Sequence, residues 1–332
     1  MTIEALNQEV DQERGKSGGW PEDLIYTAQE EAGYVGVTVT VADSAKYSVW
    51  KRIDPWGMAF FDRVKGNSSK PLRLTFSVQA PKERVDKYQY EVLKRRLSFL
   101  AEANHLEIAL MQGSLADSLY SWETLTSGHN NERVHGHFRR RSDNTAGHLE
   151  KDFQTWLLGR GKSRNRDPNL PETNERLALF GPDFVRIKSI TSAKNQDGFK
   201  VEREFPIGAF KESVKEANRI LTTEFVDLVT LNRWGDLAVI EIKFDDPKLE
   251  VISQVLNYAL FFCMYRSQLT ALLDEKLGCK TEGRGLVTYL VSNTFHKKFK
   301  SVWPYYSQRK DLLNLKRVVM GNMPEEDPCN AP

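Results

Sequence analysis

The segment EFVDLVTLNRWGDLAVIEIKF, residues 224–244, sets the expected architecture of this 332-residue chain. Two apolar runs, 224–232 and 237–244, flank the turn-forming residues RWGD. This pattern predicts two strands joined by a short hairpin loop. The second run is apolar on both faces, which is typical of a central strand covered on both sides by helices.

Two charged residues interrupt the apolar pattern of the second strand. Because side chains alternate along a strand, Glu241 and Lys243 project from the same face. An acid and a base buried there without partners would cost several kcal/mol, so Asp227 on the neighbouring strand is the expected partner. Carboxylates from two adjacent strands form a hard-oxygen site that suits Mg²⁺. On an exposed strand, the same residues would form only a surface ion pair.

The sequence on either side of the hairpin predicts alternating helices and strands. In a helix over 148–158, Glu150 lies beside the apolar stripe, so its carboxylate can reach inward. In a long helix over 249–273, Gln254 and Tyr258 are four residues apart and share a face. These two polar residues belong either to the site or to ordinary helix packing. Further strands are expected over 184–190, 200–205 and 285–293.

The N-terminal part of the chain has a different pattern. We expect a short helix over 23–32, strands over 33–42 and 72–80, and a helix over 83–104. Residues 127–147 are polar, basic and without periodicity, as in an interdomain linker. The predicted organisation is therefore a smaller α+β domain of unknown role over 1–126, a linker over 127–147, and an α/β domain with a central mixed sheet flanked by helices over 148–332.

Composition excludes several classes of protein. Hydrophobic residues make up 40% of the chain and charged residues 28%, which is too apolar for a disordered protein. The longest mostly apolar run, 255–265, is about half the length that crosses a bilayer, so we expect no membrane segment. The N-terminus lacks a hydrophobic signal region, and the three cysteines lack paired spacing. We therefore expect a cytoplasmic location.

Positive charge is concentrated in two zones. Residues 128–170 carry nine Lys or Arg against five acids, and residues 295–318 carry seven against one. Such zones either bind phosphate backbones or are solvated surface. The aromatic residues of the segment 295–310 either stack on unpaired bases or belong to the core. The candidate nucleic-acid contacts in these zones are Arg139, Arg140, Arg141, Lys297, Lys298 and Lys300.

The order of the candidate residues resembles a known family. Glu150, Asp227, Glu241-Ile242-Lys243 and Gln254-x-x-x-Tyr258 are similar to the motifs of the PD-(D/E)XK nuclease superfamily, which has the restriction-endonuclease-like fold. The segments EKDFQTWLL and VIEIKFDDPKLEVISQVLNYALFF look like those of RecB-type, NucS-type and Shedu-type nucleases. The resemblance covers residues 147–295.

This resemblance implies a role for each motif residue. Asp227, Glu241 and the Ile242 carbonyl would bind Mg²⁺ or Mn²⁺, and Glu150 would complete the acidic cluster. Lys243 would orient or activate the attacking water, while Gln254 and Tyr258 would steady the site or touch the nucleic acid.

We therefore expect a metal-dependent nuclease that hydrolyses DNA, with an endonucleolytic role in phage defence or genome maintenance. The alternatives are an inactive nuclease fold that binds nucleic acid or assembles complexes, and a nuclease that acts on RNA. We also expect a homo-oligomer, because one site cuts one strand.

Overall fold

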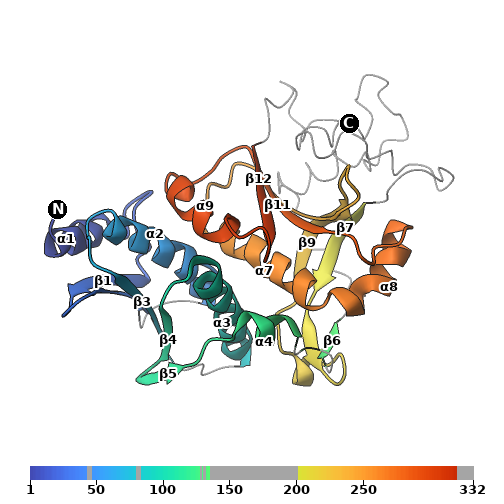
Figure 1. Ribbon diagram of the computed structural model, residues 1–332, viewed down its shortest axis with the longest axis horizontal. Coiled ribbons are helices and arrows are strands. Elements are labelled where there is room, and N and C mark those ends of the chain that lie inside the picture. The colour runs from blue at the N-terminus through green and yellow to red at the C-terminus, as the bar shows by residue number, and fades with distance from the viewer. Residues whose placement is uncertain (43–46, 80–83, 128, 130–131, 135–200, 320–332) are drawn as a thin grey trace.

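The computed structural model describes residues 1–42, 47–79, 84–127, 129, 132–134 and 201–319 (Figure 1). We call the described residues up to 134 the N-terminal half and residues 201–319 the C-terminal half. In chain order, the N-terminal half contains α1 (Ile3–Glu13), β1 (Leu24–Glu30), β2 (Val35–Val41), the 3-10 helix η1 (Tyr47–Lys51), α2 (Ile53–Lys65), β3 (Leu72–Val78), α3 (Arg84–Asn104), β4 (Ile108–Gln112), β5 (Leu115–Asp117), α4 (Trp122–Ser127) and β6 (Glu132–Val134). The C-terminal half contains β7 (Glu202–Ile207), β8 (Ala209–Lys211), the 3-10 helix η3 (Glu216–Asn218), β9 (Glu224–Leu231), β10 (Leu237–Lys243), α7 (Val251–Met264), α8 (Arg266–Leu277), β11 (Leu286–Ser292), α9 (Phe299–Ser307) and β12 (Asn314–Val319).

The C-terminal half is built on a mixed five-stranded sheet with the order β12-β11-β10-β9-β7. β10, β11 and β12 are parallel, whereas β9 runs antiparallel to both β10 and β7. The first six residues of β10 are all buried, so the expected hairpin and its central strand are confirmed. The strands expected over 200–205 and 285–293 correspond to β7 and β11.

The N-terminal half contains a second five-stranded sheet with the order β1-β2-β3-β4-β5. β2, β3 and β4 are parallel, and α2 and α3 connect them in sequence. The strands expected over 33–42 and 72–80 and the helix expected over 83–104 are confirmed as β2, β3 and α3. Gly57 lets α2 approach β3 closely, because a Cβ atom there would lie 2.3 Å from the ring of Phe76.

Helices lie between the two sheets (Figure 1). α2 contacts strands of the N-terminal sheet, and α7 contacts β10, β11 and β12. Between these layers, α2 packs on α9, and α3 packs on α7 and α9. One hydrophobic core contains residues of both halves. The fold is therefore α/β, with two mixed sheets and helices packed between them. None of the helices in the described part of the chain is long and apolar enough to span a bilayer.

The helix expected over 23–32 is wrong, because β1 occupies this segment. Leu24, Tyr26 and Ala28 are buried at every second position, which is the period of a strand. β1 pairs with β2 along its whole length. The side chain of Asn7 in α1 accepts a hydrogen bond from the Ala28 N–H of β1 at 2.9 Å and donates one to the Ala28 carbonyl at 2.7 Å. This side chain therefore satisfies two backbone groups on the open edge of β1.

The single long helix expected over 249–273 is also wrong, because Tyr265 separates α7 from α8. Its backbone leaves the helical region, with φ −108° and ψ 15°. The buried Tyr265 hydroxyl accepts a hydrogen bond from Arg95 at 3.0 Å and donates one to Glu132. Hydrogen bonds to the N-terminal half thus fix the break between α7 and α8. The apolar periodicity of the segment does not predict these contacts.

Part of the segment expected to be a linker forms a strand. β6 pairs with β8 of the C-terminal half, with Arg133 opposite Phe210. Most of residues 127–147 lie outside the described residues, as do the helix expected over 148–158 and the strand expected over 184–190.

A buried ion pair joins the helices between the sheets. Arg96 of α3 and Asp54 of α2 have no solvent exposure, and Arg96 Nη2 lies 2.9 Å from Asp54 Oδ1. Ser253 of α7 and Tyr306 of α9 each donate a hydrogen bond to Asp54 Oδ2 at 2.9 Å. Arg96 also donates to Asn257 of α7 at 3.1 Å. The charged pair and its hydrogen bonds thus join four helices, α2, α3, α7 and α9.

We predict that Arg96→Met strongly destabilises the protein. The substitution leaves the Asp54 carboxylate buried without its cation, which costs about 3–5 kcal/mol in the free energy of unfolding. Urea unfolding of purified protein measures the change. Arg309→Met is the matched control, because Arg309 pairs with Asp311 at 2.7 Å on the surface and its loss should leave the unfolding midpoint unchanged. Equal midpoints for the two variants would contradict a structural role for the buried pair.

Candidate active site

The hairpin of β9 and β10 brings two carboxylates together. The pairing of the strands ends with Ile240 opposite Leu228, so Glu241 and Asp227 are the next residues on the two strands. Opposing residues of an antiparallel pair project from the same face. The Ile242 N–H donates a hydrogen bond to Asp227 Oδ2 at 2.7 Å. The Asp227 side chain is therefore bound to the strand that carries Glu241.

Glu241 and Lys243 form an ion pair at the end of β10. Lys243 Nζ lies 2.7 Å from Glu241 Oε1, and the exposed fractions of the two side chains are 13% and 1%. Burial of such a pair removes both charges from water, which limits its contribution to stability. The pair lies at the carboxyl end of a strand parallel to β11, and open α/β sheets bind ligands at the carboxyl ends of their strands.

The two polar residues of α7 form a chain of hydrogen bonds to β9. Gln254 Nε2 donates to the Tyr258 hydroxyl at 2.7 Å, and this hydroxyl donates to the Phe225 carbonyl at 3.0 Å. Burial, followed by the charges of Glu241, Glu224 and Asp227, raises the pKa of Tyr258 well above its usual value. A neutral, fully buried Tyr258 therefore holds α7 against β9. Its hydroxyl is hydrogen-bonded to Gln254 and to the Phe225 carbonyl.

A cavity of about 240 Å³ opens beside Lys243. Both signs of charge line its wall, with three lysines and three acids, and Gln254 of α7 also faces it. The lining residues are Lys51, Glu224, Lys243, Asp246, Lys248, Glu250, Val251, Ser253, Gln254 and Asn257.

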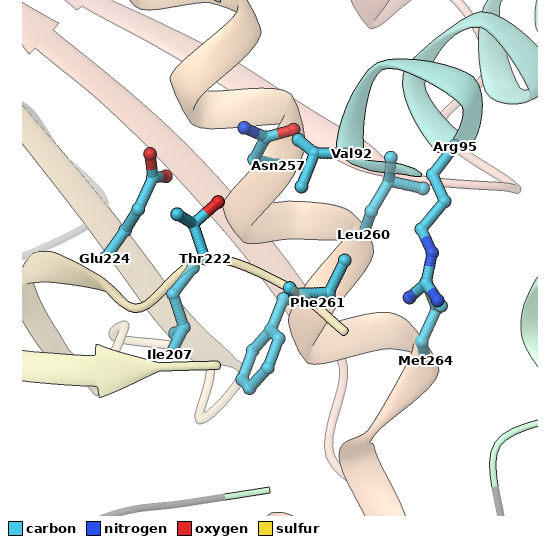
Figure 2. A pocket seen from close by; sticks show the side chains of 10 residues that line it. Val92, Arg95, Ile207, Thr222, Glu224, Asn257, Leu260, Phe261 and Met264 are labelled. Carbon is cyan, nitrogen blue, oxygen red and sulfur yellow. The ribbon is translucent and has the colours of Figure 1, made fainter. Parts of the chain in front are cut away.

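A smaller, mainly apolar cavity of about 30 Å³ lies between α3, α7 and the start of β9 (Figure 2). It shares Glu224 and Asn257 with the larger cavity. In Figure 2 these two side chains stand on the side away from Arg95 and Met264. Glu224 and Asn257 therefore border both cavities.

The side chains at the end of β10 include oxygen donors of the kind that hard divalent cations prefer. Asp227 and Glu241 supply carboxylate oxygens, and Mg²⁺ is commonly held by one or two carboxylates together with waters. Within the described ranges, no group of three or more His, Cys, Asp or Glu could hold a metal ion. Glu150, which the resemblance assigns to the same cluster, lies outside these ranges. The two carboxylates are thus of the ligand type that Mg²⁺ prefers, with Glu241 Oε1 paired to Lys243 and Asp227 Oδ2 bonded to the Ile242 N–H.

The basic zone at the start of α9 is divided between surface and core. Lys297 and Lys300 are exposed, whereas Lys298 is half-buried with Nζ 3.9 Å from the centre of the Trp20 ring. Three aromatic residues of the same zone, Phe299, Tyr305 and Tyr306, are buried. For these three rings the core interpretation is therefore correct.

The structure brings together five of the side chains that the sequence singled out: Asp227, Glu241, Lys243, Gln254 and Tyr258. Arg139, Arg140 and Arg141 lie outside the described residues. Sequence reasoning missed Glu224, Asp246, Lys248 and Glu250. Glu224 begins β9, and the other three lie between β10 and α7. Sequence reasoning also missed Lys51, for which no local signal exists.

We predict that Lys298 makes stability depend on pH. Burial, and then the charge of Arg63, lowers the pKa of Lys298 to about 8, against roughly 10.4 in the unfolded chain. Between these values the unfolded chain holds more protons, so this lysine makes the unfolding free energy rise with pH. Lys298→Met should therefore gain less stability than wild type when the pH is raised from about 7 to about 9.5.

Urea unfolding at the two pH values measures this gain. Lys300→Met, which changes an exposed lysine of the same helix, should gain as much as wild type. An equal gain for Lys298→Met would contradict the lowered pKa.

The sequence matches no protein-family model, and it matches no curated protein. The similarity to PD-(D/E)XK nucleases therefore rests on the motif residues.

Proposed function

We propose that this protein is a metal-dependent nuclease that hydrolyses phosphodiester bonds of DNA. The observation that carries the proposal is the buried Glu241–Lys243 pair, which lies beside Asp227 at the carboxyl end of β10 and next to a charged cavity. An acid pair can hold the cation that activates water for phosphodiester hydrolysis, and a lysine beside it can donate to that water or to a phosphate oxygen. The proposed setting is phage defence or genome maintenance in the cytoplasm, with cleavage inside the strand.

Each residue of the site has a distinct task in this proposal. Asp227 and Glu241 would hold Mg²⁺ or Mn²⁺, which when bound neutralises phosphate charge and lowers the pKa of water. Lys243 Nζ donates hydrogen bonds to the attacking water or to a phosphate oxygen, and Glu241 keeps it in place at 2.7 Å. Gln254 faces the cavity and orients the substrate. Tyr258 fixes α7 on β9 through the Phe225 carbonyl.

A homo-oligomer is part of the proposal, because one site cuts one strand and a double-strand break requires two. The rival interpretation is an inactive fold in which Glu241 and Lys243 are only a structural pair. The two interpretations predict opposite results for the same variant.

We predict that Lys243→Ala abolishes cleavage while DNA binding persists. Loss of a positioned proton donor lowers rates by about 10²–10⁴-fold, whereas the metal carboxylates remain. Single-turnover cleavage and thermal melting are measured on the same sample, together with Lys276→Ala. Lys276 pairs with Glu202 at 3.3 Å and is absent from the cavity wall, so this control should cleave normally. A destabilised Lys243→Ala protein with undiminished specific activity would favour the structural pair.

We also predict that cleavage depends on the metal. Mg²⁺ or Mn²⁺ should support turnover, and Ca²⁺ should support binding alone, because its larger and looser coordination shell orients water poorly. The assay uses supercoiled DNA, linear DNA and RNA, with each ion and with EDTA. Asp227→Ala should lose Mg²⁺ binding in calorimetry, whereas Asp311→Ala on the surface should retain it.

Robust cutting in EDTA would overturn the metal mechanism. Cleavage of RNA but not DNA would change the substrate while leaving the mechanism intact.

A further inference from the structure

The cavity beside Lys243 contains one residue from the N-terminal half. Nine of its lining residues belong to the segment 224–257, and the tenth is Lys51 at the end of η1. Lys51 Nζ lies 2.7 Å from Glu224 Oε1, and the exposed fraction of the Lys51 side chain is 51%. An ammonium group from a distant part of the sequence is thus within the wall of the candidate active site.

The buried ion pair fixes the backbone that carries Lys51. Arg96 Nη2 donates a hydrogen bond to the Trp50 carbonyl at 2.5 Å. Arg96 also donates to Asn257, and its partner Asp54 accepts from Ser253. Asn257 and Ser253 line the same cavity. The residue before Lys51 and the α7 wall of the cavity are therefore attached to one buried group.

Two of the three lysines on the cavity wall are exposed to solvent. Lys51 pairs with Glu224, and Lys248 pairs with Asp246 at 3.0 Å, with exposed fractions of 51% and 68% for the two lysines. The exposed Lys248 pair contributes only about 0–1 kcal/mol. The Glu224 side chain is only 15% exposed, but the Lys51 ammonium itself is open to solvent and can contact a phosphate that enters the cavity. Lys243 differs, because its pair with Glu241 is nearly buried.

We propose that Lys51 binds a backbone phosphate of the DNA next to the phosphate that is cut, so that both halves of the chain form the substrate site. This inference rests on the proposed nuclease function. Lysines that contact phosphates position the substrate and carry no sequence information. In the free protein, Glu224 holds the Lys51 ammonium at the cavity and gives it up when DNA binds.

We predict that Lys51→Ala weakens DNA binding in Ca²⁺ and lowers the slope of log affinity against log salt by about one. The affinity ratio of wild type to variant should fall about three- to fourfold between roughly 50 and 200 mM salt. Fluorescence anisotropy with labelled linear DNA measures both quantities. Lys70→Ala is the matched control, because Lys70 also pairs with a carboxylate, Glu30, at 2.6 Å and is similarly exposed. It should bind as wild type does.

Glu224→Gln provides a second test, because it changes the partner of Lys51 and leaves the lysine in place. It releases Lys51 from its pair and should tighten DNA binding. Removal of a negative charge alone would also tighten binding, so the double variant Lys51→Ala/Glu224→Gln is required. Most of the gain should disappear in the double variant if Lys51 is the phosphate ligand. An equal gain in both backgrounds would overturn the inference.

The outcomes separate the two proposals. If wild type binds neither DNA nor RNA, the nuclease proposal fails and the role of Lys51 fails with it. If wild type binds DNA and Lys51→Ala matches Lys70→Ala in affinity and salt slope, only the role of Lys51 fails. Binding of RNA alone, with the same loss in Lys51→Ala, would replace DNA by RNA as the substrate.

Discussion

Arg96 and Asp54 meet without solvent at the point where the helices between the two sheets converge. The position of α7 depends on this pair, since Ser253 on one side of the helix bonds to Asp54. Ser253 also lines the cavity of the site, together with Gln254 and Asn257 of the same helix. Tyr258 lies one turn after Gln254 and bonds to it. Tyr258 also reaches β9 through its hydroxyl. The arrangement of the candidate active site is therefore coupled to the N-terminal half through a single helix.

The Arg96–Asp54 and Glu241–Lys243 ion pairs differ in what surrounds them. Around Arg96 and Asp54, hydroxyl, amide and carbonyl groups from η1, α7 and α9 complete the hydrogen bonding, and the charges have no access to water. The Lys243 side chain retains 13% exposure, and a cavity lies beside it. A fully enclosed pair resists any change, whereas a pair at a cavity wall can interact with a ligand. We therefore regard the first pair as structural and propose the second as part of the active site.

The sequence predicts features that depend on local periodicity. The apolar pattern of 224–244 was sufficient for β9, β10 and the proximity of Asp227 to Glu241, because strand alternation and a short loop fix both. It failed for β1, where seven residues are too few to separate a strand from a helix, and at Tyr265, where tertiary hydrogen bonds end α7. Lys51 could not be found, because its place in the cavity depends on contacts between distant segments.

The position of α7 also has a consequence for the dynamics of the protein. This helix has a sheet on one side and α3 on another, and most of its residues are buried. Its amide protons can exchange with solvent only when the layers separate, and separation requires the enclosed ion pair to break. Local opening of such a segment approaches the free energy of global unfolding. The amides of α7 are therefore expected to be among the slowest to exchange with deuterium, whereas the ends of the exposed strand β5 exchange early.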